Sequence, residues 1–304
     1  MDVVLQQLVN AITLSAMYAL IAVGVTLFFG VLGIVNLAHG DIAMLGVFMS
    51  LAAYRVALLI PGIDPITAGI IGAFCGTTIS AVAGWLMYQI AFRPLSSAPP
   101  IIGLIASVGA GFTIRESILN FYPDGRNPQQ FPEIVPVKAW LFGDTVILQT
   151  QVLILVVSIV SVICLATLIE RTRLGRAMRA IVNNPEMAKL LGVPVNVVIG
   201  VAFLLGSALA GVAGVLNGLY YNVIQFDMGL SLTTKGFTAA VIGGLGSMYG
   251  ALVGAVIVGI IEAFTAGFLP DGSAYKEIAI FLTLSAILII RPTGIIKQQS
   301  SEKV

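Results

Sequence analysis

Long apolar runs separated by short polar segments make up most of the chain. A helix crosses the hydrocarbon core of a bilayer with about 20 apolar residues, because each residue adds about 1.5 Å to a thickness of about 30 Å. Such runs cover residues 8–32, 41–60, 66–92, 99–121, 147–169, 195–221, 237–269 and 277–290. The run 237–269 is too long for one straight span, and a glycine-rich stretch divides it, which predicts a short or re-entrant helix before a full span. The pattern predicts an all-α membrane protein with eight to nine transmembrane helices, some of them broken, in a single domain over residues 1–304.

Small residues recur every four positions in three of these runs and so share one helix face. Such stripes let membrane helices approach closely, and we expect them to be packing surfaces. Their members are Gly72, Gly76, Ser80 and Gly84, then Gly206, Ala210, Gly214 and Gly218, and finally Gly246, Gly250 and Gly254.

The composition agrees with a membrane protein and excludes several other classes. Hydrophobic residues make up 58% of the chain and charged residues 10%, against about 25% charged residues in soluble domains. A net charge of +1 provides no basic surface for nucleic acid. Cys75 and Cys164 lie in apolar runs, with neither a metal-ligand nor a disulfide spacing, so no bound metal is expected.

The distribution of basic residues predicts the orientation, since short cytoplasmic loops are rich in lysine and arginine. The segment 121–146 has only two basic residues and many prolines, and it is expected to be an ordered, extended loop on the outer side. The side of Met1 stays open, because residues 34–40 form either a cytoplasmic turn or a break inside the membrane. Basic residues that indicate the cytoplasmic side occur in the loop 171–192 and in the tail, namely Arg171, Arg173, Arg176, Arg179, Lys189, Arg291, Lys297 and Lys303.

Two stretches interrupt the apolar pattern and are candidates for a translocation pathway. Backbone leaves the helical conformation at membrane depth only where protein or a water-lined cavity satisfies it, and broken helices point to the central site of a transporter. The stretch 33–41 contains the only histidine of the chain. The stretch 243–250 contains four glycines. The candidate pathway residues are Asn36, His39, Asp41, Gly243, Gly244, Gly246 and Ser247.

Some of the polar residues in these runs also have structural interpretations. Asp41 is suited to cap the helix that follows it, a role compatible with a place in the pathway. His39 is expected to be a hydrogen-bonded histidine. Arg115 and Glu116 lie near the outer end of a span, where they are expected to pair with one another or to reach the interface. Glu262 is expected to bond a neighbouring helix, with a proton-relay role as the alternative.

The cytoplasmic loop contains a short helix with signals at both ends. Asn184 is suited to the N-cap and Pro185 to the first helical position, while Glu186 complements the positive end of the dipole. Gly192 is suited to end the helix. A helix of two turns is not stable alone. Its apolar residues therefore need a partner, either the spans of this chain or a docked soluble subunit, and the pattern leaves both open. These residues are Met187, Leu190 and Leu191, and the charged residue Lys189 lies among them.

Sequence signatures of a catalyst are missing from the chain. It has no G-x-x-x-x-G-K-[ST] phosphate loop, no H-E-x-x-H pair and no G-x-S-x-G elbow. We therefore expect a protein that is not an enzyme and binds no cofactor itself.

Several long motifs resemble one known family. They are YALIAVG at 18–24, GIVNLAHGDIAML at 33–45, RLGRAMRAIVNNPEMAKLLG at 173–192, AAVIGGLGSMYGALVG at 239–254 and RPTG at 291–294. With these motifs the chain resembles the permeases of branched-chain amino acid ABC importers, of the LivH-like type, over nearly its whole length.

This resemblance implies an ABC-importer permease fold in the bacterial inner membrane. It implies a second permease subunit, two cytoplasmic ATPase subunits that bind ATP and Mg, a periplasmic substrate-binding protein, and lipid around the spans. It also implies that the segment 184–192 carries a coupling helix that docks on an ATPase. The implied substrates are branched-chain or other neutral amino acids. The alternatives are a urea or short-amide importer, and an ion-coupled transporter with Asp41, Glu116 or Glu262 as coupling carboxylate.

Overall fold

A computed structural model describes residues 2–296 of the chain, except 97, 135–137 and 144. Parts of the predicted outer loop and the tail residues Lys297 and Lys303 therefore lie outside the described residues.

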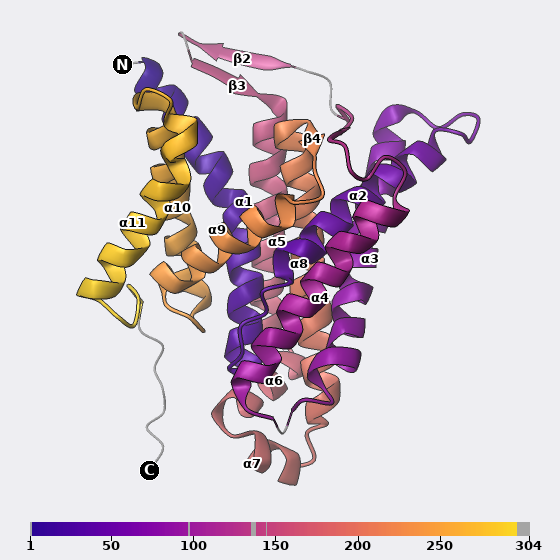
Figure 1. Cartoon of the computed structure of the whole chain (residues 1–304), viewed down its shortest axis with the longest axis vertical. Coiled ribbons are helices and arrows are strands. Elements are labelled where there is room, and N and C mark those ends of the chain that lie inside the picture. Colours follow the sequence, from indigo (N-terminus) through magenta and orange to yellow (C-terminus); the bar gives the residue numbers. More distant parts are fainter. Residues whose placement is uncertain (1, 97, 135–137, 144, 297–304) are drawn as a thin grey trace.

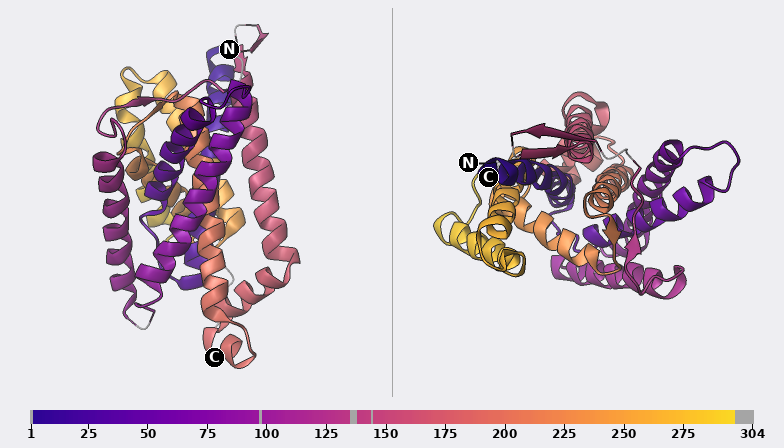
Figure 2. Two further views of the ribbon diagram at one scale, coloured as in Figure 1. Left: turned by 90° about the vertical axis from the view of Figure 1, so that its right-hand side faces the viewer. Right: turned by 90° about the horizontal axis from the view of Figure 1, so that it is seen from above.

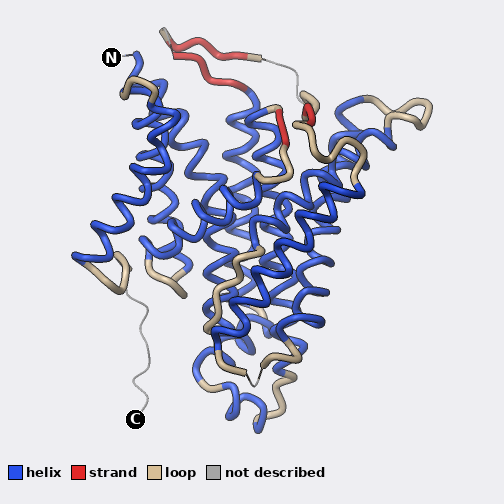
Figure 3. The backbone as a smooth tube through the Cα atoms, viewed as in Figure 1, coloured by secondary structure: helices blue, strands red, loops and turns tan. Residues whose placement is uncertain are grey.

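Helices dominate the described part of the chain (Figure 1), and the short strands gather toward one end of the molecule (Figure 3). The helices are α1 (Asp2–Leu32), α2 (His39–Ala57), α3 (Pro65–Met87), which continues into the π-helical turn η1 (Tyr88–Phe92), α4 (Pro100–Phe121), α5 (Gln149–Arg171), α6 (Arg173–Asn183), α7 (Pro185–Leu190), α8 (Val195–Tyr221), α9 (Met228–Gly243), α10 (Met248–Phe268) and α11 (Gly272–Ile290). Two antiparallel pairs join β1 (Gln129–Gln130) to β4 (Val223–Ile224) and β2 (Ala139–Phe142) to β3 (Thr145–Leu148).

Within the described residues, eight helices are long and apolar enough to cross a membrane: α1, α2, α3 with η1, α4, α5, α8, α10 and α11. This confirms the predicted all-α membrane fold. The break in the run 237–269 is also confirmed. The short helix before it, α9, begins at Met228 rather than at residue 237, so the sequence pattern missed its first turns.

The core of the bundle is built from α1, α2 and α8, with α5 and α11 at the periphery (Figure 2). The predicted glycine stripes lie where backbones come closest. Gly76 of α3 packs on the carbonyl of Gly46 in α2, and Gly214 of α8 packs on the carbonyl of Ala43. Gly254 of α10 similarly packs on α9. The first two stripes are therefore confirmed as packing surfaces, whereas in the third only Gly250 and Gly254 lie in α10, because Gly246 belongs to the turn before it.

Replacing Gly214 by alanine is expected to destabilise the fold by about 1–3 kcal/mol, because the new methyl group would overlap the Ala43 carbonyl and force two helices apart. Thermal unfolding of the purified variant in detergent measures this. Gly109→Ala in α4 is the matched control, since no atom lies within 4 Å of the added Cβ there. Equal melting temperatures for the two variants would contradict the packing role.

The structure settles the orientation of the first helix relative to the rest. The amino end of α1 lies beside the β2–β3 hairpin, where the Val146 backbone N–H donates to Gln6 Oε1 at 2.9 Å. This end is opposite α6 and α7 (Figures 1 and 2). If α6 and α7 are cytoplasmic, as the basic residues predict, the amino end of α1 is outside. Residues 33–38 then turn back from the inner end of α1, and α2 begins inside the bundle, because His39 is fully buried.

Candidate functional site

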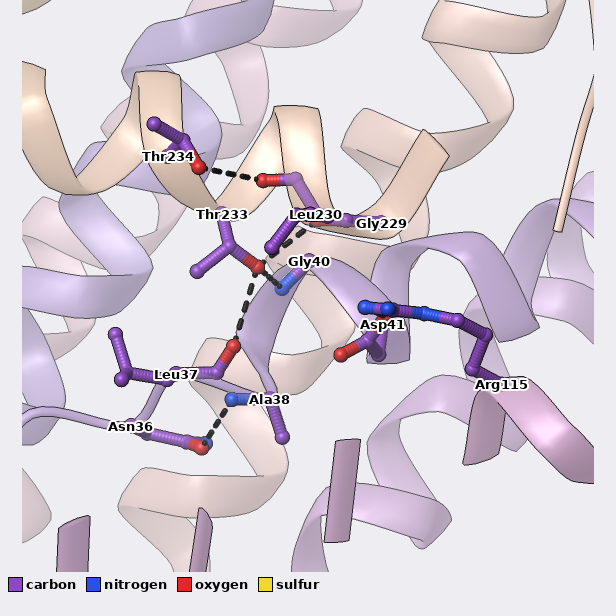
Figure 4. Close-up of polar contacts among 10 residues, drawn as sticks. All are labelled: Asn36, Leu37, Ala38, Gly40, Asp41, Arg115, Gly229, Leu230, Thr233 and Thr234. Carbon is purple, nitrogen blue, oxygen red and sulfur yellow. Dashed lines mark hydrogen bonds and ion pairs between the residues drawn. The ribbon is translucent and has the colours of Figure 1, made fainter. Parts of the chain in front are cut away.

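The first predicted break, residues 33–41, is non-helical only over residues 33–38, because α2 begins at His39, and a threonine of α9 holds it in place (Figure 4). The hydroxyl of Thr233 accepts a hydrogen bond from the Gly40 backbone N–H at 2.9 Å. The same oxygen lies 2.9 Å from the carbonyl of Gly229 and 3.2 Å from the carbonyl of Leu37, and it can donate its single hydrogen to either of them. Asn36 turns inward and its Oδ1 accepts from the Ala38 N–H at 3.1 Å. Protein groups thus satisfy the backbone N–H groups of Ala38 in the break and of Gly40 at the start of α2, as a break at membrane depth requires.

Asp41 forms an ion pair instead of the predicted cap. Because α2 begins at His39, Asp41 lies within its first turn and makes no side-chain cap. Its Oδ1 pairs with Arg115 Nη2 of α4 at 3.0 Å (Figure 4). The prediction that Arg115 pairs with Glu116 or reaches the interface is therefore wrong. Gly111 and Gly229 pack on the Asp41 carboxylate, where a Cβ would collide with it.

His39 packs as an aromatic ring. Its side chain is fully buried and meets the ring of Phe28 edge-on, with 5.0 Å between ring centroids. Neither ring nitrogen has a hydrogen-bond partner among the described residues. The expectation of a hydrogen-bonded histidine is wrong, because the nearest space is occupied by Gly24 and Phe28 rather than by polar groups.

The second break joins α9 to α10 and is an ordered turn. Gly244 and Gly246 adopt φ angles of 110° and 88°, which side chains other than glycine rarely tolerate. Ser247 caps α10, since its hydroxyl accepts from the Gly250 N–H at 3.1 Å. The carboxyl-terminal segment pairs with the end of α9, where the Ile296 N–H donates to the Gly243 carbonyl at 2.9 Å.

The two breaks lie at opposite ends of α9, which crosses the middle of the bundle (Figure 1). The first break is hydrogen-bonded to Thr233 near the amino end of α9, and the second break begins at Gly243, where α9 ends. The structure therefore connects the predicted pathway residues through α9 without bringing the two groups into contact. Gly246 also lines a cavity of about 340 Å³ with residues of α1, α5 and α6, whereas Asn36, His39 and Asp41 do not line it.

The predicted cytoplasmic helix is present as α7, with the expected ends. Asn184 Oδ1 accepts from the Met187 N–H at 3.0 Å, and Pro185 occupies the first position. The helix ends at Leu190 with Leu191 as its C-cap, and Gly192 follows with a φ of 82°, as expected of a glycine that ends a helix. Glu186 and Lys189 lie in the first and last turns. The predicted ends of α7 are confirmed, and the coupling role of this helix stays a prediction.

The apolar side chains of α7 point away from the bundle. Met187 is 56% exposed, and Leu190 and Leu191 are each 81% exposed, whereas Ala188 is buried. The helix is held by α6, which sequence analysis missed. Helix α6 begins at a Thr172 cap, and its Arg179 donates to the Ile169 carbonyl at the end of α5. The signal for α6 is an amphipathic period of 3.6 residues over Arg173–Asn183, the segment whose basic residues also predict the orientation.

Replacing Asn184 by alanine is expected to remove the α7 cap and to reduce local helix stability by about 0.5–2 kcal/mol. Hydrogen exchange of the α7 amides, Met187 above all, should speed up by about twofold to thirtyfold, as this range of free energy implies. Asn183→Ala is the matched control, because the exposed Asn183 ends α6 and caps nothing. If both variants exchange alike, the cap does not hold α7.

A buried ionic cluster joins α1, α9, α10 and α11. Glu262 Oε1 pairs with Lys235 Nζ at 2.6 Å and with Lys276 Nζ at 3.5 Å. Tyr18 donates its hydroxyl hydrogen to Glu262 Oε2 at 2.7 Å and accepts from Lys235 at 3.2 Å. The interpretation that Glu262 bonds neighbouring helices is confirmed. Lys235 was missed because it precedes the residue at which the short helix was predicted to begin.

Comparison with known proteins finds relatives that match nearly the whole chain. Residues 7–290 match the family model described as "Branched-chain amino acid transport system / permease component". The chain is 37% identical to the high-affinity branched-chain amino acid transport system permease protein BraD of Pseudomonas aeruginosa, over 99% of this chain and 98% of the relative. It is 35% identical to LivH of Escherichia coli K12, which has the same description, over 99% of this chain and 97% of the relative.

A more distant relative is the probable branched-chain amino acid transport permease protein LivH of Methanocaldococcus jannaschii, with 28% identity over 94% of this chain and 90% of the relative. The family match and the similarity to BraD and LivH span nearly all of the described helices. Together with the eight spans, they make the chain a multi-pass protein of the bacterial inner membrane. The chain belongs to the branched-chain amino acid transport permease family of ABC transporters.

Proposed function

We propose that the chain is the permease subunit of an ATP-driven importer for branched-chain or other neutral amino acids. The observation that carries this proposal is its similarity to BraD and LivH over 99% of its length, without a large insertion or missing domain. Proteins that share so much of one membrane bundle share its helix packing, and hence the walls of any pathway through it.

The assembly we propose contains a second permease, two cytoplasmic ATPases and a periplasmic binding protein. The ATPases would bind ATP and Mg, since the sequence of this chain has no phosphate-binding loop. The exposed side chains of α7 support docking of an ATPase, because a short helix with an uncovered apolar face is stabilised by burying that face in a partner's groove.

A connected path leads from α7 into the bundle. Helix α7 follows α6, and α6 lines the cavity that also contains Gly246 of the second break. Helix α9 connects that break to Thr233 and the first break. We propose that ATP binding moves α7, that α9 transmits the movement, and that the permease pair switches between inward and outward opening around the two breaks.

Uptake in proteoliposomes tests the proposal. The chain, its partner permease, ATPases and binding protein are reconstituted and given labelled leucine, alanine or urea, with or without ATP on the ATPase side. ATP-dependent accumulation of leucine or alanine supports the proposal. Accumulation of urea alone would assign the chain to a short-amide importer instead. Uptake driven by an ion gradient without ATP would overturn the importer assignment.

A further inference from the structure

A cavity of about 490 Å³ with several polar lining residues lies between α1, α8, α9 and α11, toward the end of the molecule opposite α6 and α7. Its walls include Asn217 and Tyr221 of α8, Ser231 and Lys235 of α9, and Lys276 of α11. Binding sites for small molecules have volumes of about 300–1,000 Å³ and contain a few converging polar groups. The size and lining of this cavity are therefore suited to a ligand as large as an amino acid.

The wall of this cavity carries more positive than negative charge near the buried cluster. Lys235 and Lys276 share the single carboxylate of Glu262, and within the described residues no other carboxylate lies within 4 Å of either ammonium group. Glu277 is exposed, and Asp227 lines the cavity without pairing with either lysine. Lys235 is paired closely with Glu262, whereas Lys276 makes only the longer contact with the same carboxylate, so its ammonium group is incompletely paired and would attract an anion in the cavity.

Both lysines that contact Glu262, Lys235 and Lys276, line the cavity, although Glu262 itself, which is 3% exposed, does not. Lys235 uses two of its three N–H donors, on Glu262 and Tyr18, so one donor has no partner among the described groups. Lys276 makes a single long contact at 3.5 Å. Both lysines therefore retain hydrogen-bonding capacity for an anion in the cavity.

We propose that this cavity binds the carboxylate of the transported neutral amino acid through Lys235 and Lys276. The hydroxyl and amide groups of Asn217, Tyr221 and Ser231 supply further hydrogen bonds within the same space. This inference rests on the proposed function, because it takes the ligand to be the transported substrate. It adds a binding site that the predicted pathway residues do not include.

The test uses a thiol probe in the cavity wall of the complete reconstituted transporter. Ser231→Cys is introduced after Cys75 and Cys164 are replaced by alanine, and the rate of its modification by a small methanethiosulfonate reagent is measured. Leucine and 4-methylpentanoate, which carry a carboxylate, are expected to slow modification at least threefold at millimolar concentration. Leucinamide, which lacks the carboxylate, is expected to have no such effect.

Lys276→Gln in the same background is expected to abolish the protection, while the Lys235–Glu262 pair remains and keeps the melting temperature unchanged. Lys138→Gln removes a lysine that does not line this cavity, and the variant is expected to retain the protection by leucine. Three results would overturn the proposal: equal protection by leucinamide, equal protection by inorganic phosphate, or protection that survives Lys276→Gln.

Uptake measured on the same preparation separates this inference from the proposed function. ATP-driven leucine uptake without protection of the cysteine would overturn the cavity assignment and leave the importer in place. Protection of the cysteine together with leucine uptake that needs no ATP would support the cavity as the binding site and would overturn the assignment as an ATP-driven importer.

Discussion

Replacing Glu262 by alanine is expected to destabilise the folded chain by about 3–5 kcal/mol, because it leaves the Lys235 ammonium buried without its partner. The side chains of Lys235 and Glu262 are only 7% and 3% exposed, so the lysine loses its main partner in a largely buried position. The free energy of unfolding, measured by denaturant titration in lipid-containing micelles, gives the size of the effect.

Two further variants separate the buried charge from loss of packing. The double variant Lys235→Met with Glu262→Met removes both charges while filling similar volume, and it is expected to regain most of the lost stability. Lys276→Gln is expected to change stability little, since Lys276 is 28% exposed and its contact with Glu262 is longer. A single Glu262→Ala variant as stable as the parent would show that Lys235 is not held by this pair.

Replacing Leu190 by glutamate is expected to reduce ATP-dependent uptake at least tenfold without changing membrane insertion or melting temperature. Leu190 is 81% exposed in the isolated chain, so a charge there costs the fold little. If α7 fits an apolar groove of an ATPase, the same carboxylate would be buried without a partner in the complex, at a cost sufficient for this loss. Uptake and co-purification of the ATPases are measured on one preparation.

Ser96→Glu is the matched control, because it adds the same charge to another exposed turn at the end of the bundle that carries α7. That variant is expected to transport normally. Normal uptake by the Leu190→Glu variant would remove the coupling role from α7. Equal loss in both variants would indicate a general effect of negative charge at this end of the molecule.

The features predictable from sequence are those that depend on neighbours close in the chain. Apolar runs located all eight spans, because length and hydropathy alone decide whether a helix can cross a bilayer. The ends of α7 followed from Asn184 and Gly192, whose capping bonds reach only a few residues along the chain. Glycine stripes such as the one that contains Gly214 located close packing, since a period of four residues defines a helix face.

Sequence could not supply the polar partners inside the bundle. Arg115 lies 74 residues from Asp41, Thr233 lies 193 residues from Gly40, and Tyr18 lies 244 residues from Glu262. Each group has several possible partners of the right chemistry, and hydropathy does not distinguish among them. The residues next to Asp41 in the chain therefore predict a cap, whereas its partner in the fold is Arg115.

The candidate sites also contain features set by neighbours in the chain and features set by distant partners. The local sequence pattern predicted both breaks and the cytoplasmic helix, because glycine, proline and asparagine restrict or permit backbone conformations at their own positions. The tertiary structure alone placed α9 between the breaks and brought Lys235, Glu262 and Lys276 to one cavity wall. Helices meet through side-chain packing and charge pairing over the whole bundle, so these neighbours are decided by the fold and not by spacing in the chain.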